Sequence, residues 1–100
     1  MQRFALWLVC AGASFWILPS TDASACDHCV AKQKAQQQAS EGRMRHVGGS
    51  MGSGRYEGVG FSTTSADAAI RNCCYWGQRP TTGIGVVRGN NGWYATVLYR

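Results

Sequence analysis

Residues 83–99 read GIGVVRGNNGWYATVLY, and this stretch decides the fold. Two runs rich in β-branched and aromatic residues, 83–88 and 93–99, flank the sequence GNNG at residues 89–92. Apolar runs on either side of a short Asn- and Gly-rich turn are typical of a β-hairpin. The segment therefore predicts two antiparallel strands.

Two registers of this hairpin are open. A turn centred on residues 90–91 pairs Val86 with Ala95, whereas a turn centred on 91–92 pairs Val86 with Val97. Because the two registers differ by two residues, both place the same side chains on each face. The face expected to form the core carries Ile84, Val86, Trp93, Ala95, Val97 and Tyr99. The opposite face carries Val87, Tyr94, Thr96 and Leu98.

A third strand and a helix are expected ahead of the hairpin. Residues 55–61 favour a strand, and residues 62–65 are rich in helix N-cap types. From residue 66 to residue 73, apolar side chains recur at the spacing of one helix face. We therefore expect residues 55–100 to form a small α+β domain of β-α-β-β order. Its three-stranded, mainly antiparallel sheet would carry one helix on one face and leave the other face uncovered.

The first 25 residues have the organisation of an export signal. Arg3 precedes an apolar run over residues 4–18, which is too short to cross a bilayer comfortably. Residues 23–25, Ala-Ser-Ala, match a signal-peptidase cleavage pattern. We expect a signal peptide over residues 1–25, a secreted or periplasmic protein, and no transmembrane segment in the remaining chain. The alternative is lipidation of Cys26, which would anchor the protein to a membrane.

Residues 26–54 are expected to form a cysteine-containing arm and a Gly/Ser-rich linker that are largely flexible. Residues 32–39 are fair helix formers, but they carry no apolar stripe. A helix that is polar all round is marginal on its own. Residues 42–54 hold five glycines, which is the composition of a flexible linker.

Four cysteines follow the expected cleavage site: Cys26, Cys29, Cys73 and Cys74. In a small exported domain an even number of cysteines favours disulfides. We expect the arm to be stapled to the helix, through bridges 26–73 and 29–74 or through bridges 26–74 and 29–73. Pairing within each close pair would require a strained ring between the adjacent cysteines.

Two other functions use the same residues. The four thiolates, with His28 as a substitute ligand, could hold copper or zinc in an envelope protein. A dithiol redox activity at Cys26 and Cys29 is a further alternative, but it requires the C-x-x-C motif at the start of a helix. The sequence predicts neither a stable helix there nor a strand before it.

Composition and charge favour binding over catalysis. The chain has a net charge of +5, which is either ordinary solubility charge on a small domain or a source of long-range attraction to anionic polymers. Both histidines lie in the segment expected to be flexible, where a general base cannot hold its geometry. We therefore expect a small exported module that is not an enzyme, acts in binding or structure and needs no cofactor.

The candidate binding surface is the uncovered sheet face. It would carry Tyr56, Arg88, Tyr94 and Leu98. The expected partner is a second copy of the chain, an envelope polymer or an envelope protein. Nucleic acid is not expected, because export separates the protein from it.

Overall fold

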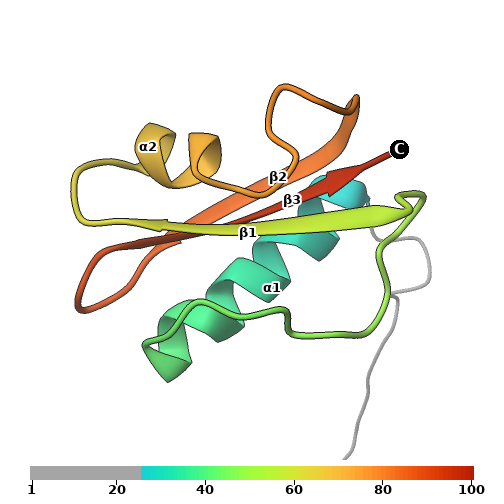
Figure 1. The fold of residues 1–100 in the computed structure, drawn as a ribbon. Helices are drawn as coiled ribbons and strands as arrows, with labels where there is room; N and C mark the ends of the chain where they lie inside the picture. Colours follow the sequence, from blue (N-terminus) through green and yellow to red (C-terminus); the bar gives the residue numbers. More distant parts are fainter. Residues whose placement is uncertain (1–25) are drawn as a thin grey trace, which may run out of the picture.

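The computed structural model describes residues 26–100, and the signal peptide expected over residues 1–25 lies outside this range. Its elements are α1 (Asp27–Glu41), β1 (Tyr56–Ser62), α2 (Ala66–Arg71), β2 (Thr81–Arg88) and β3 (Trp93–Tyr99) (Figure 1). The predicted small α+β fold with a three-stranded antiparallel sheet is confirmed. From β1 onward the elements follow the predicted β-α-β-β order, and α1 precedes them.

The sheet has the order β1-β3-β2, so β3 is its central strand. Both neighbours run antiparallel to it. In the β2–β3 hairpin Val86 pairs with Ala95, which is the register of a turn centred on residues 90–91. On the other side of β3, Gly60 of β1 pairs with the same Ala95.

Helix α2 packs on the face predicted to form the core. The buried cluster there consists of Ala69, Cys73, Ala95, Val97 and Tyr99, with Ile84, Val86 and Trp93 packed against it. The helix begins after Ser65, whose hydroxyl accepts a hydrogen bond from the Ala68 N–H at 3.1 Å. This N-cap satisfies one of the free amides at the start of the helix.

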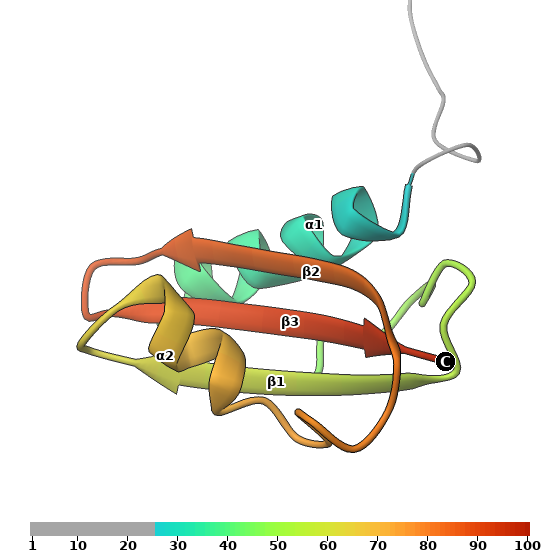
Figure 2. The same cartoon turned by 90° about the horizontal axis from the view of Figure 1, so that it is seen from above.

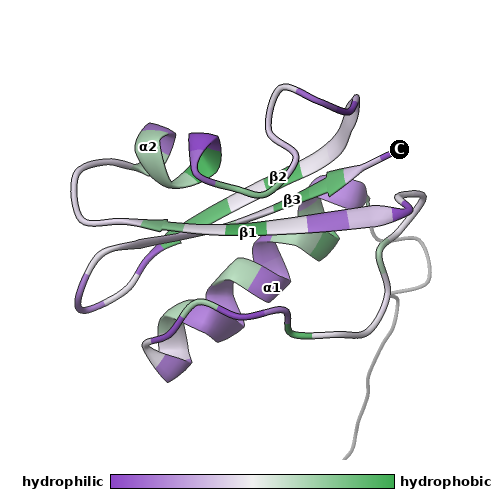
Figure 3. Ribbon diagram, in the orientation of Figure 1, coloured by the Kyte–Doolittle hydropathy of each residue, from purple (hydrophilic) through white to green (hydrophobic). Residues whose placement is uncertain are grey.

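Helix α1 covers the second face of the sheet, so the sheet lies between α1 and α2 (Figure 2). The expectation of an uncovered face is therefore wrong, and the expectation of a largely flexible segment over residues 26–54 is wrong for residues 27–41, which form α1. The buried stripe of α1 has helical spacing, but its members are small or polar: Ala31, Lys34, Ala35 and Gln38. Hydrophilic residues recur along the whole helix (Figure 3), so an apolar pattern could not reveal this stripe.

Glycines on β2 let α1 approach the sheet backbone closely. A Cβ atom at Gly85 would lie 2.3 Å from the backbone nitrogen of Lys32. At Gly83 it would lie 2.5 Å from backbone atoms of Asp27. Missing side chains in a strand often mark such close approaches. Glycines on β2 therefore let the backbone of α1 lie close to this strand.

Contacts at three places anchor the segment between α1 and β1. The Arg45 N–H donates to Oε1 of buried Gln38 at 3.3 Å. The side chain of His46 lies against Glu57, as described below. Near the end of the segment, the N–H and the hydroxyl of Ser53 both donate to the Asp27 carboxylate, which holds the pKa of Asp27 below its ordinary value.

Candidate functional site

The four residues of the predicted binding face do not share one exposed face. Tyr94 and Leu98 are buried, at 1% and 0% exposure, on the face that α1 covers. Tyr56 lies on the other side of the sheet, opposite Tyr99 in the register, and is partly exposed. Arg88 lies at the far end of the sheet, where its guanidinium carbon is 5.3 Å from the ring centre of Trp93. The predicted face is therefore wrong as a single surface.

The predicted cross-links between the arm and the helix are also wrong. Cys26 and Cys29 pair with each other across a Cα–Cα distance of 5.0 Å. Cys73 and Cys74 are free thiols. The sheet lies between the two pairs, because α1 carries one pair on one face and the other pair follows α2 on the opposite face.

The same arrangement separates the proposed metal ligands. Among residues 26–100, no three His, Cys, Asp or Glu side chains come together in a group that could hold a metal ion. His28 is engaged elsewhere, since its Nδ1 accepts a hydrogen bond from the Ile84 N–H at 3.0 Å. The structure does not bring together a four-cysteine site.

The two free cysteines differ in environment. Cys73 is 4% exposed, and burial raises the pKa of its thiol to about 12. Its Sγ lies 3.6 Å from the Ala69 carbonyl oxygen. Cys74 is exposed. Because the thiolate is the reactive form, Cys73 is inert at ordinary pH.

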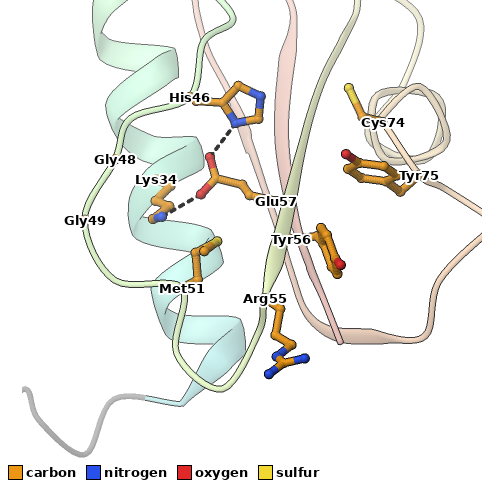
Figure 4. Close-up of a pocket in the computed structure, with 10 residues that line it drawn as sticks. All are labelled: Lys34, His46, Gly48, Gly49, Met51, Arg55, Tyr56, Glu57, Cys74 and Tyr75. Carbon is orange, nitrogen blue, oxygen red and sulfur yellow. Dashed lines mark hydrogen bonds and ion pairs between the residues drawn. The ribbon is translucent and has the colours of Figure 1, made fainter.

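A pocket of about 470 Å³ lies along the outer edge of β1 (Figure 4). It has two sides, one on each face of the sheet. The α1 side carries Lys34, His46 and Glu57, and the α2 side carries Tyr56, Cys74 and Tyr75. The segment before β1 contributes Gly48, Gly49, Met51 and Arg55.

A buried ion pair forms the α1 side. Lys34 Nζ lies 2.6 Å from Glu57 Oε1, and both side chains are below one-tenth exposed. His46 Nδ1 lies 2.9 Å from the other carboxylate oxygen of Glu57. These contacts join α1, β1 and the segment between them, so they fix the shape of this wall.

Arg79 adjoins the two tyrosines of the α2 side, and we call Tyr56, Tyr75 and Arg79 the Arg–Tyr cluster. The Tyr56 and Tyr75 rings meet edge to face, with centres 5.7 Å apart. The guanidinium carbon of Arg79 lies 3.6 Å from the Tyr56 ring centre and 5.3 Å from that of Tyr75. Both tyrosine residues are more than one-third exposed. Such cation–π contacts hold a guanidinium in place while its N–H groups stay available.

Tyr75 adopts a backbone conformation that is rare for its residue type. Its φ is +67°, and it is the one residue other than glycine with positive φ among residues 26–100. Bulky side chains disfavour this region, so surrounding contacts must hold it. The Tyr75 ring packs edge-on against that of buried Tyr99, at 5.9 Å between centres. Strained residues of this kind concentrate at binding and active sites.

Basic side chains without an acidic partner gather at the same end of the sheet. The four acidic side chains of residues 26–100 are each engaged: Asp27 with Ser53, Glu41 with Arg45, Glu57 with Lys34, and Asp67 with Arg71. Arg55 and Arg100 directly flank the paired ends of β1 and β3, and Arg79 precedes the start of β2. None of the three forms an ion pair with another described residue, so this end carries unbalanced positive charge.

The sequence could not identify most of this site. Tyr56 is the one member of the Arg–Tyr cluster among the predicted site residues. Tyr75 and Arg79 lie in the turn between α2 and β2, and no pattern there indicates positive φ at a tyrosine. Two adjacent aromatic residues followed closely by an arginine, in the sequence YWGQR at 75–79, are the signal that could have drawn attention to them.

Comparisons with protein-family models, with curated proteins and with solved structures found no match to this chain. Neither helix within residues 26–100 has the length and apolar character that crossing a membrane requires.

Proposed function

We propose that this chain is a small exported binding module, not an enzyme, and that its binding site is the Arg–Tyr cluster with the adjoining pocket. The observation that carries the proposal is Tyr75, held at positive φ so that its exposed ring stands beside Tyr56 and Arg79. Exposed, rigid aromatic rings beside an arginine are the residue types that dominate binding energy at interfaces. Export is supported by the pattern of residues 1–25.

The described residues offer little for acid–base or nucleophilic catalysis. His46 contacts Glu57, but no hydroxyl or thiol nucleophile is hydrogen-bonded to either histidine among residues 26–100. The thiol of Cys73 is buried and has a raised pKa. Catalytic nucleophiles need an adjacent base or a lowered pKa. The geometry therefore favours binding.

The binding proposal is tested with a panel of soluble polysaccharides and peptides, using isothermal titration calorimetry on protein purified from cells that express the full chain. Tyr75→Ser should weaken binding of any ligand found by about tenfold, because it removes a ring that anchors the site. The matched control is Met44→Ser, which removes another exposed apolar side chain outside the cluster. If both variants bind as the wild type does, the cluster is not the binding site.

One observation favours a second candidate function, a dithiol redox activity. The C-x-x-C motif begins helix α1, with Cys26 as its N-cap, and both cysteines are exposed. The Cys29 N–H lies 3.0 Å from Cys26 Sγ, where it would stabilise a thiolate after reduction. In the exchange, a partner dithiol would give two electrons and two protons to the disulfide and become a disulfide itself.

Equilibration with glutathione buffers, followed by thiol trapping, tests this activity. A redox-active pair becomes reduced at a potential near those of known exchange proteins and catalyses reduction of a model disulfide. Cys29→Ser should abolish that catalysis, while Cys74→Ser should leave it intact. A pair that stays oxidised throughout the buffer range, with no catalysis, would exclude a redox role.

A further inference from the structure

We infer that the Arg–Tyr cluster binds carboxylate groups of an acidic polysaccharide, with Arg79 as the principal anion-binding side chain. This inference rests on the proposed binding function and names the chemistry of the ligand. It starts from the state of the Arg79 side chain. The guanidinium is stacked on Tyr56 and near Tyr75, yet no hydrogen bond joins it to an acceptor within residues 26–100.

Stacking leaves the edge of a guanidinium free to bind. The planar group presents its N–H donors in a fork that matches the two oxygens of a carboxylate. Because Arg79 already packs on Tyr56, with its guanidinium carbon 3.6 Å from the ring centre, less side-chain freedom remains to be lost on binding. Arg79 is thus preorganised for a bidentate contact with an oxyanion.

Further donors line the adjoining pocket. Arg55 lines the pocket and has no acidic partner among the described residues. Gly48 and Gly49 line it too, both at positive φ, and no hydrogen bond within residues 26–100 uses their N–H groups. Successive exposed backbone amides form concave surfaces that attract anions. Glu57 does not oppose these donors, because Lys34 neutralises it.

The shape of the site favours an extended polymer. The pocket is open and follows the edge of a strand instead of enclosing a small molecule. Arg55, Arg79 and Arg100 lie around one end of the sheet, so a chain with repeated carboxylates could meet more than one of them. The exposed ring of Tyr75, apolar with a polar tip, suits the face of a sugar.

A membrane surface fits the same end less well. Large exposed hydrophobic side chains among the described residues are Met44, Tyr56 and Tyr75. Peripheral membrane contacts depend on a set of Trp, Phe and Leu side chains that insert below the headgroups. That set is not found here, so charge and aromatic stacking must supply the binding energy.

The test uses polygalacturonate as the probe, with dextran as a neutral polysaccharide and single-stranded DNA as an anion of another class. Protein purified from cells that express the full chain is titrated with each polymer at low and moderate salt. We expect binding to polygalacturonate, none to dextran and weaker binding to DNA. Arg79→Gln should weaken polygalacturonate binding by about tenfold or more, the usual loss for a charged hydrogen-bond pair.

Two further variants separate the site from general charge. Arg88→Gln is the matched control, because it removes an arginine that also lies over an aromatic ring but at the far end of the sheet. Arg88→Gln should change the affinity for polygalacturonate by less than about twofold at moderate salt, where long-range charge effects are screened. Arg79→Lys keeps the charge and loses the fork, so it should regain only part of the affinity.

Equal losses from Arg79→Gln and Arg88→Gln would overturn the inference, since net charge alone would then explain binding. Equal binding of dextran would overturn the ligand class, and tighter binding of DNA would assign a nucleic acid. If the protein binds a neutral ligand and Tyr75→Ser weakens that binding, the proposed binding function stands and the inference of an acidic ligand is wrong. Circular dichroism of each variant checks that the fold is intact.

Discussion

At the scale of single residues, the buried Lys34–Glu57 pair gives the sharpest stability prediction. Glu57→Gln leaves the Lys34 ammonium group buried without a charged partner. Breaking a buried pair in this way typically costs about 3–5 kcal/mol. We expect a loss of this size in the free energy of unfolding, measured by urea denaturation.

The exposed pair Asp67–Arg71 is the control for that prediction. Its side chains are 83% and 58% exposed, and its shortest distance is 3.3 Å. Asp67→Asn should cost less than about 1 kcal/mol, because exposed pairs contribute little. If Glu57→Gln costs no more than Asp67→Asn, the pair does not join α1 to β1 as described.

The two free thiols should react at very different rates. At about pH 8, iodoacetamide should modify exposed Cys74 and leave buried Cys73 intact in the folded protein. Peptide mapping by mass spectrometry measures the two sites separately. Equal modification of both cysteines under native conditions would contradict the packing of Cys73 against the sheet.

The same burial predicts how stability depends on pH. Burial raises the pKa of Cys73 from 9.0 to about 12 and that of Tyr99 from 10.0 to about 12. Between about pH 9 and pH 12 these two groups lose their protons in the unfolded chain and keep them in the folded chain. The free energy of unfolding should therefore fall as the pH rises. Urea denaturation across this range, with Cys73→Ala for comparison, measures the effect. A smaller slope is expected in the variant, and an unchanged slope would exclude Cys73 as its source.

At the scale of elements, the close contact between α1 and β2 is open to a direct test. In Gly85→Ala the new methyl group would lie 2.3 Å from backbone of α1, so the helix must move away. Overpacking of this kind costs about 1–3 kcal/mol. Hydrogen exchange should show faster exchange of the α1 amides than in the wild type, with β1 and β3 less affected.

Gly77→Ala is the matched control for this variant. Gly77 has no atom near the position of a Cβ, but its φ is +82°. The substitution should therefore cost about 1 kcal/mol through backbone strain and leave α1 attached. A Gly85→Ala protein with wild-type exchange in α1 would contradict the docking of that helix.

The elements also show what the sequence can and cannot predict. The hairpin and the core face over Ile84 to Tyr99 follow from alternation and from the turn at residues 89–92, which are local properties. Helix α1 does not, because its buried stripe is formed by Ala31, Ala35 and two polar residues. Gln38 can be buried there because it has hydrogen-bond partners, among them Thr96, whose Oγ1 lies 2.7 Å from the Gln38 side-chain nitrogen. Such a partner is a property of the folded chain.

The candidate site, like the elements, could be predicted from the sequence only where it depends on local pattern. The sequence identified Tyr56, which belongs to a predicted strand, but its net charge could not locate a basic surface. It did not identify Tyr75 or Arg79, because their positions depend on a left-handed residue in an irregular turn. Tyr94 and Leu98 were wrongly assigned to the binding surface, because the sheet face that they occupy was expected to be open and is covered by α1.

At the scale of the whole molecule, the fold should survive reduction of its disulfide. The Cys26–Cys29 bridge joins residues only three apart in sequence. On chain-entropy grounds so short a loop contributes at most about 2 kcal/mol. The unfolding temperatures measured with and without a phosphine reductant should therefore differ only modestly. Peptide mapping that joins Cys26 to Cys73 or Cys74 would contradict the observed pairing.

The central claim is that the Arg–Tyr cluster, at one end of this molecule, binds acidic polysaccharide. The most direct measurement is a titration of the ¹⁵N-labelled protein with a short oligogalacturonate, followed by amide chemical shifts. We predict that the largest shifts fall in residues 48–57 and 74–79, around the pocket and the cluster, and that Arg79→Gln removes them. Largest shifts around Arg88 and Trp93, or no shifts at all, would contradict the claim.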